Sequence, residues 1–275
     1  MNDIKQGAAN LINKVRGESP LVHHITNYVT ANDCANMTLS IGGSPIMADA
    51  KEEVADIARI ASSVVINIGT LNERTIPSMI MAGKVANESG IPVVFDPVGA
   101  GASRLRNDTA DRIVDEINIT VLRGNISEVT YLTGKKAQTK GVDASEHDMQ
   151  NMSGTVAIAK LLATELECVV AITGAVDIVS DGERTICIKN GNPTLSNITG
   201  TGCMCSSLIG AFCGAAPNMP LIATVAALLT MGIAGEIAFS KAGQLGNGSF
   251  RTALHDAVSK IDTDTLMRRA KIYEA

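Results

Sequence analysis

Apolar and polar positions follow two different periods along this chain, and the switching between them predicts an α/β fold. Short apolar runs rich in β-branched residues predict buried strands at 64–68, 93–95, 119–122 and 169–172. Between them, apolar residues at helical spacing predict helices at 74–89, 109–117 and 153–166. This alternation is typical of a mostly parallel sheet with helices on both faces, a three-layer αβα arrangement.

The pattern changes after Gly174. Segments 177–180 and 184–188 flank Asp181-Gly182, a dipeptide typical of a tight hairpin turn. An antiparallel hairpin at the edge of a parallel sheet is common, so we expect a mixed sheet. At least three helices should follow. Since no repeat or composition shift divides the chain, we expect a single domain over residues 1–275.

Composition narrows the class of protein. The 275 residues are 45% hydrophobic, enough for a large core, and their net charge of −5 with no lysine or arginine cluster argues against nucleic-acid binding. Arg104-Leu105-Arg106 and Arg268-Arg269 are expected to be ordinary solvated positions. Residues 1–20 carry charges throughout, unlike a secretory signal. The six cysteines lack metal-ligand spacing, so we expect a reduced, cytoplasmic protein.

One long stretch, residues 190–235, contains no charged residue and could suggest a membrane hairpin. Small polar residues run through it, and Pro217 and Pro220 interrupt it. Its longest strongly apolar piece, 221–234, is too short to span a bilayer. We therefore expect two helices buried inside a soluble protein and no membrane association.

The most informative segment is a small-residue turn, 199–202, that leads into a helix starting near Cys203. The amides of Gly200, Thr201 and Gly202 at a helix start could hold a phosphate or a developing anion. Such turns are also common as plain structure. Cys203 would face the held group, with its pKa lowered by the helix N-terminus. The turn comes too late for a Rossmann fingerprint, and the chain has no Walker A loop.

Polar residues also follow several predicted strands, where ligands bind in open α/β sheets. Asp96 is either a magnesium-side carboxylate or a turn residue, and Glu128 is either its partner or the N3 member of a capping box with Asn125. Arg123 either binds phosphate or forms a buried ion pair. Thr173, followed by Gly174, suits a nucleotide loop.

The N-terminal third offers weaker candidates. Asn27 either orients a small polar ligand or caps a helix over 28–40. Met47 is expected in the core, although a methionine could also contact a soft heterocycle. His23 and His24 are adjacent, so they cannot face the same side of a strand, and a two-histidine metal site is not expected.

Taken in order, six motifs make the chain resemble the hydroxyethylthiazole kinase family of ribokinase-like α/β kinases. They are HHITNYVT (23–30), GSPIMA (43–48), DPVGAG (96–101), LRGN (122–125), TG (173–174) and TGTGC (199–203). The resemblance spans roughly residues 15–260. It implies ATP-dependent phosphorylation of the side-chain hydroxyl of 4-methyl-5-(2-hydroxyethyl)thiazole in thiamine biosynthesis. It also implies Mg²⁺ and a homotrimer with substrate sites at subunit contacts.

The resemblance also implies roles for individual residues. Substrate contacts would come from Met47, Gly200 and Asn27, ATP contacts from Arg123 and Thr173 with Asn125 beside them, and metal-side carboxylates from Asp96 and Glu128. Cys203 stands where most ribokinase-like enzymes carry a base aspartate, and a cysteine there is usual in this family. Two alternatives stay open: a kinase of another small heterocyclic alcohol, such as hydroxymethylpyrimidine, and a non-catalytic nucleotide-binding regulator.

Overall fold

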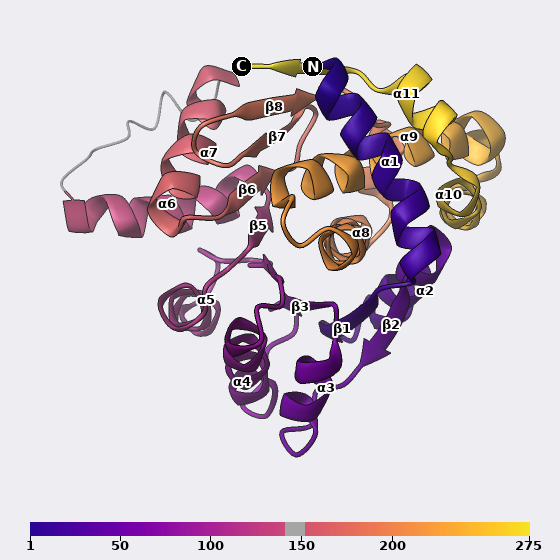
Figure 1. Ribbon diagram of the computed structural model, residues 1–275. Coiled ribbons are helices and arrows are strands. Elements are labelled where there is room, and N and C mark those ends of the chain that lie inside the picture. The colour runs from indigo at the N-terminus through magenta and orange to yellow at the C-terminus, as the bar shows by residue number, and fades with distance from the viewer. Residues whose placement is uncertain (141–151) are drawn as a thin grey trace.

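A nine-stranded sheet forms the centre of the computed structural model, which describes residues 1–140 and 152–275 (Figure 1). The strand order is β2-β1-β3-β4-β5-β6-β7-β8-β9. The strands are β1 (Leu21–Ile25), β2 (Ser44–Met47), β3 (Ser63–Asn67), β4 (Val93–Asp96), β5 (Val121–Gly124), β6 (Val169–Ile172), β7 (Asp177–Ser180), β8 (Thr185–Ile188) and β9 (Ile272–Glu274).

Strands β1 to β6 run parallel, whereas β7, β8 and β9 each pair antiparallel with their neighbours. The α/β class, the mixed sheet and the edge hairpin expected from the sequence are thereby confirmed. The hairpin turns at Asp181, whose carboxylate accepts the Arg184 amide at 2.7 Å, and at Gly182, whose φ of 94° suits glycine. This turn explains why the sequence signal there was strong.

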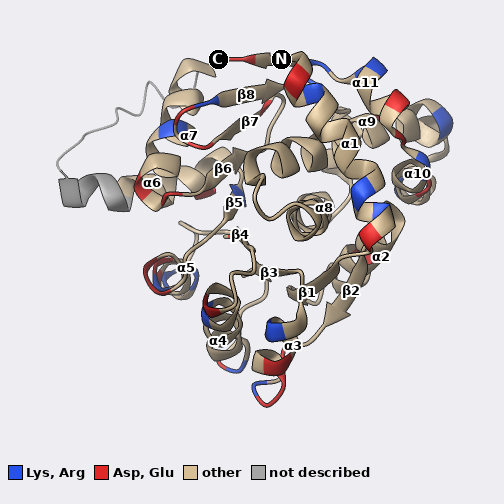
Figure 2. Ribbon diagram, viewed as in Figure 1, with Lys and Arg blue, Asp and Glu red and all other residues tan. Residues whose placement is uncertain are grey.

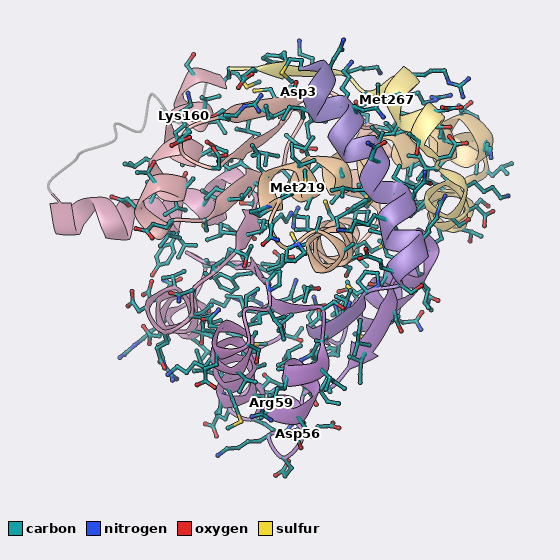
Figure 3. All side chains as sticks on the ribbon, in the orientation of Figure 1. Asp3, Asp56, Arg59, Lys160, Met219 and Met267 are labelled. Atoms are coloured by element: carbon teal, nitrogen blue, oxygen red, sulfur yellow. The ribbon has the colours of Figure 1, made fainter. Side chains whose placement is uncertain are left out.

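Helices cover both faces of the sheet (Figure 1). One face packs against α1 (Asn2–Glu18), α2 (Ala31–Ile41), α8 (Thr201–Ala215), α9 (Pro220–Ala242), α10 (Asn247–Lys260) and α11 (Thr263–Arg269). The other packs against α3 (Val54–Ile60), α4 (Thr75–Glu88), α5 (Arg104–Glu116), α6 (Ile126–Lys140) and α7 (Met152–Leu166). Side chains fill the space between the layers (Figure 3), which gives two apolar cores. Short 3₁₀ turns lie at Pro193–Asn197 and Gly243–Leu245.

Local capping explains two differences from the predicted boundaries. The helix expected at 109–117 begins at Arg104, because the hydroxyl of Ser103 accepts the amide of Arg106 and caps it. The helix expected from residue 28 begins at Ala31, because Asn27 folds back onto Thr30: its Oδ1 accepts both the Thr30 amide and the Thr30 hydroxyl. Asn27 therefore shapes the turn before α2 and is not its N-cap.

The uncharged region forms α8 and α9, whose ribbons carry very few charged positions (Figure 2). Helix α9 is longer than the apolar piece seen in the sequence, and among the described residues the segment Pro220–Leu245 is long and apolar enough to cross a membrane. However, 83% of its apolar window is buried within the protein. The core helix predicted from the sequence accounts for this burial.

Candidate active site

Parallel pairing brings the predicted polar residues to one edge of the sheet. Asn67 and Asp96 end β3 and β4 and are register partners. Arg123 lies near the end of β5, and Thr173 directly follows β6, where its amide donates to Gly124 O at 2.9 Å. Helix α8 begins beside them. The strand-end site expected for an open α/β sheet is therefore present as a geometric cluster.

Gly200 is the N-cap of α8 and adopts a backbone conformation that is unfavourable for other residues. Its φ is 85°, and a Cβ built on it would lie 2.4 Å from Cγ2 of Thr30. Its carbonyl accepts the Met204 amide at 2.8 Å, the first helical bond. The amides of Thr201, Gly202 and Cys203 therefore occupy the open positive end of the helix, as an anion site requires.

Gly202 leaves room for the guanidinium of Arg123. A Cβ at this position would lie 2.6 Å from Arg123 Nη1. The same guanidinium donates to the Thr173 hydroxyl at 2.5 Å and lies 3.6 Å from Asp96 Oδ2. Arg123 thus forms the buried ion pair that was one of its two possible roles, and it also lines the cavity described below, while phosphate binding stays a prediction.

Asp96 is fully buried with one carboxylate oxygen saturated. Its Oδ2 accepts the Asn67 amide at 2.9 Å and the Ser206 hydroxyl at 2.8 Å. Its Oδ1 has no hydrogen-bond partner among the described residues. Burial raises the pKa of this carboxyl, although nearby Arg123 and the two hydrogen bonds oppose the rise. A buried, orphaned carboxylate oxygen is suited to a hard cation.

Glu128 and Asn125 form a reciprocal capping box at the start of α6. Glu128 Oε2 accepts the Asn125 amide at 2.8 Å, and Asn125 Oδ1 accepts the Glu128 amide at 2.9 Å. Glu128 Oε1 accepts the amide of Gly99 at 2.8 Å, so it also ties down the loop after β4. The capping interpretation is thus present in the structure, and any contribution of Glu128 to a metal would have to coexist with it.

Cys203 lies against two side-chain amides. Nδ2 of Asn27 and Nδ2 of Asn67 each donate to its sulfur at 3.3 Å. Burial raises the pKa of this thiol, Asp96 raises it further, and the hydrogen bonds from Thr30, Asn27 and Asn67 only partly offset the rise. The expectation of a lowered pKa was therefore wrong, and burial is the largest cause of the rise.

A cavity of about 490 Å³ opens beside the start of α8. Arg123, Thr173 and Gly202 line one end, and the apolar residues Leu195, Leu228 and Met231 line another. Its wall includes the segment 190–192, which Glu236 holds by accepting the Asn190 side-chain amide at 3.1 Å and the Gly191 amide at 3.3 Å. A polar end beside an apolar wall suits a nucleotide.

A second hollow, of about 430 Å³, lies at the opposite end of the sheet, and none of the predicted site residues lines it.

Met47 does not lie in the core as expected, whereas the two adjacent histidines point to different partners as expected. Met47 is 42% exposed at the end of the edge strand β2, so it is not a core residue. His23 and His24 are buried and use different partners, the Ala48 carbonyl at 2.7 Å and the Thr38 hydroxyl at 3.2 Å. Within the described residues no group of three or more His, Cys, Asp or Glu side chains is placed to hold a metal ion.

Several residues of this cluster were missed or misjudged in the sequence. Ser206 is one turn into α8, where an uncharged apolar helix hides its link to Asp96. Asp177 lines the cavity, and burial raises its pKa to about 6. Arg106 is not simply solvated: it donates to the Ile68 and Gly69 carbonyls at 3.3 and 2.6 Å, and also to the Val98 carbonyl, joining the loops after β3 and β4. These links depend on tertiary contacts, which no local motif reports.

The mixed sheet with helices on both faces is the ribokinase-like fold. A ribokinase-like superfamily protein from Enterococcus faecalis shares the fold with a TM-score of 0.61 at 12% identity, covering 96% of this chain and 95% of that one. The chain belongs to the hydroxyethylthiazole kinase family, whose model matches residues 12–264. A hydroxyethylthiazole kinase of Ruminiclostridium cellulolyticum is 56% identical over the whole of both chains. The solved hydroxyethylthiazole kinase of Pyrococcus horikoshii is 40% identical, with a TM-score of 0.88 and 98% of each chain covered.

The family resemblance drawn from the motifs is thereby confirmed, and the chain is a kinase of thiamine biosynthesis. A non-catalytic regulator is accordingly disfavoured. The roles of individual residues, the metal and the oligomeric state stay predictions.

Proposed function

We propose that this chain transfers the γ-phosphoryl group of ATP to the hydroxyl of 4-methyl-5-(2-hydroxyethyl)thiazole. The observation that carries this proposal is the position of the α8 start between two different environments. Gly202 lines the cavity suited to a nucleotide, and the next residue, Cys203, lies among the asparagines. A phosphoryl group passing from one side to the other would meet the open amides of the first helical turn.

In this mechanism the chain contributes position and charge. The transition state of phosphoryl transfer is loose and spreads negative charge over the transferred group. The amides of Thr201, Gly202 and Cys203 would stabilise that charge, and Arg123 with Thr173 would bind the phosphate tail. Because its pKa is raised, Cys203 is a protonated thiol at neutral pH, so it orients the alcohol, and only its small thiolate fraction could take up the alcohol's proton.

A coupled assay of ADP formation with ATP, Mg²⁺ and the thiazole alcohol tests the proposal directly. Turnover should depend on the thiazole alcohol and exceed that with hydroxymethylpyrimidine. Equal or greater turnover with hydroxymethylpyrimidine would assign the alternative heterocycle. ATP binding without turnover of either alcohol would indicate a regulator.

Asp96 fits a magnesium site better than Glu128 does, because Asp96 Oδ1 is unpaired while both Glu128 oxygens hold backbone amides. The ion would neutralise phosphate charge and help to align the transferred group. We expect Asp96→Asn to raise the Mg²⁺ concentration for half-maximal activity by about 10-fold or more. Glu128→Gln should raise it less and mainly lower the melting temperature, because glutamine has one acceptor oxygen and can keep only one of the two backbone amides that Glu128 accepts, from Asn125 and Gly99.

Titration of initial rates with Mg²⁺, at saturating ATP and thiazole alcohol, measures both effects. An unchanged metal requirement in a folded Asp96→Asn variant would remove Asp96 from the metal site. A larger shift in Glu128→Gln than in Asp96→Asn would reverse the assignment.

We propose that the enzyme is a homotrimer with substrate sites at subunit contacts, Met47 and Asn27 being on the thiazole side. The N-terminal third supports this proposal because several of its large apolar side chains are exposed. These are Tyr28, Val29, Leu39, Met47 and Ile60. Aromatic residues and methionine are enriched where subunits meet.

Light scattering at micromolar concentration should report three times the mass of one chain. Tyr28→Asp should lower the mass and the activity together, because Tyr28 is 81% exposed in one chain and an interfacial carboxylate would be desolvated. Leu105→Asp, an equally drastic change at an exposed position on α5, is the control and should stay trimeric. A fully active monomer would contradict the shared site.

We further propose that residues 1–275 act as one kinase domain in the cytoplasm. All six cysteines lie within the described residues, and all are free and buried. A chain that keeps six thiols unpaired suits a reducing compartment.

A further inference from the structure

Asn67 joins the two halves of the candidate active site through a single side-chain amide. It is the last residue of β3 and is 1% exposed. Its Nδ2 donates to Asp96 Oδ2 at 2.9 Å and to Cys203 Sγ at 3.3 Å. No other side chain in the described residues has a hydrogen bond to both groups.

The orientation of this amide is determined by its partners. Oδ1 of Asn67 accepts the backbone amide of Gly69 at 2.9 Å and Nδ2 of Asn27 at 3.0 Å. A backbone N–H can only donate, so the atom facing Gly69 must be oxygen, and the nitrogen must face Asp96 and Cys203. Both hydrogens and both lone pairs are in use, so the side chain has no alternative position of similar energy.

The same network orients Asn27. With Nδ2 of Asn27 directed at Asn67 Oδ1 and Cys203 Sγ, its Oδ1 is left to accept from Thr30. The sulfur of Cys203 therefore receives two amide donors in a fixed geometry. Charged groups facing this cluster come from three elements, Asp96 on β4, Arg123 on β5 and Glu128 on α6.

We propose that Asn67 is a positioning residue that holds the Cys203 sulfur and the Asp96 carboxylate in one fixed arrangement, so that the alcohol side and the metal side of the site act as a unit. By occupying Asp96 Oδ2, it also leaves Oδ1 as the oxygen free for a cation. The inference rests on the roles proposed above for Cys203 and Asp96.

A merely structural role for Asn67 makes a different prediction. Its bond to the Gly69 amide is an Asx turn, and aspartate would form that turn equally well. An amide donates to Asp96 and Cys203 at once, whereas an ionised carboxylate donates to neither and a carboxyl that shares a proton with Asp96 has a single O–H. Asn67→Asp therefore keeps the shape and the turn acceptor but loses at least the donor to Cys203 or the donor to Asp96, which separates positioning from folding.

The test is a double-mutant cycle of Asn67→Asp and Cys203→Ser, with kcat and both KM values measured at saturating Mg²⁺. We expect Asn67→Asp to lower kcat by about 10-fold or more while KM for ATP changes by less than about threefold, because the nucleotide cavity is untouched. The double variant should lose at least about fivefold less than the product of the single losses, as expected for groups acting together.

Asn87→Asp is the matched control. Asn87, on α4 at the far end of the sheet, also uses both ends of its amide: Nδ2 donates to the Asn118 carbonyl and Oδ1 accepts the Asn118 amide, each at 2.8 Å. The same chemical change there should leave kcat within about twofold and cost only stability. Thermal melting confirms that each variant is folded, and Asn67→Ser serves if Asn67→Asp is not, since serine keeps a turn acceptor and can replace only one donor.

Alkylation of Cys203 by iodoacetamide, followed by mass spectrometry without substrate, gives a readout independent of turnover. Loss of an N–H donor and gain of a carboxylate should slow alkylation in Asn67→Asp by about 10-fold, and Asn87→Asp should not slow it. Multiplicative kinetic losses, or unchanged alkylation, would overturn the inference while leaving the kinase proposal intact. A fully active Cys203→Ser enzyme would instead overturn the proposed role of Cys203, and alkylation alone would then decide whether Asn67 positions the thiol.

Discussion

Gly202→Val should abolish measurable turnover in a protein that still folds. A Cβ at Gly202 would lie 2.6 Å from Arg123 Nη1, so valine must displace the guanidinium that contacts Thr173 and Asp96. It would also cover the amide end of α8, where the transferred phosphoryl is proposed to pass. Loss of one oxyanion-type donor alone costs a factor of about 10² to 10³ in kcat, and this variant disturbs a cation as well.

Gly248→Val provides a matched control for this expectation. Gly248 is the second residue of α10, as Gly202 is of α8, and a Cβ there would meet nothing within 4 Å. Steady-state kinetics and thermal melting should therefore show normal activity in Gly248→Val and lost activity in Gly202→Val. If Gly202→Val does not fold, Gly202→Ala tests the same contact with a smaller side chain. Near-normal turnover in a folded Gly202 variant would show that the turn is only structural.

The parts of the fold that the sequence predicted are those with local signals. The β-branched run at 169–172 predicts a strand, and this segment is β6 in the structure. The dipeptide Asp181-Gly182 predicts the hairpin of β7 and β8. Strand β9 was missed because three residues carry no periodicity, and its identity as a strand depends on pairing with β8, which lies more than 80 residues earlier in the chain.

In the site, as in the fold, residues with a local sequence signal were predicted and contacts between distant segments were not. Asp96, Arg123 and Thr173 were found because each stands at a strand end, a position defined by local pattern. Their connections were not predictable: Ser206 reaches Asp96 across 110 residues of sequence, and Asn67 reaches Cys203 across 136. The raised pKa of Cys203 was also out of reach, because burial is a property of the packed chain and not of the helix start alone.

Cys203→Ser should lower kcat within the range of about 10² to 10⁴ that is typical for loss of a general base. A serine hydroxyl ionises far less readily than a thiol, so even the small thiolate fraction that could act as a base is lost. The hydroxyl is also shorter, so the donors from Asn27 and Asn67, each 3.3 Å from sulfur, would not be matched. KM for ATP should change little, because Cys205 and not Cys203 lines the nucleotide cavity. Mass spectrometry of the enzyme after turnover should find no phosphocysteine, since the alcohol attacks ATP directly. A phospho-enzyme at Cys203 would contradict this mechanism.

Cys203→Asp should retain the activity of the parent enzyme or exceed it. The ordinary pKa of an aspartate lies about three units below pH 7, so a carboxylate can stay ionised here although burial raises its pKa, whereas this thiol, with its raised pKa, is protonated. The two amide donors already aimed at residue 203 and the α8 N-terminus would both stabilise the new charge. Asp96 opposes it, and a fixed negative charge also repels the incoming phosphate. We expect the gain in basicity to prevail, because Arg123 and the amides of the first turn offset that charge.

Steady-state kinetics of Cys203→Asp, compared with Cys203→Ser and Cys203→Asn, separates basicity from charge repulsion. The asparagine matches the aspartate in shape but cannot accept a proton. Activity in the Cys203→Asp variant but not in the Cys203→Asn variant therefore identifies a base. A Cys203→Asp enzyme that binds ATP and does not turn over would show that repulsion prevails and that the thiol serves to keep this position neutral.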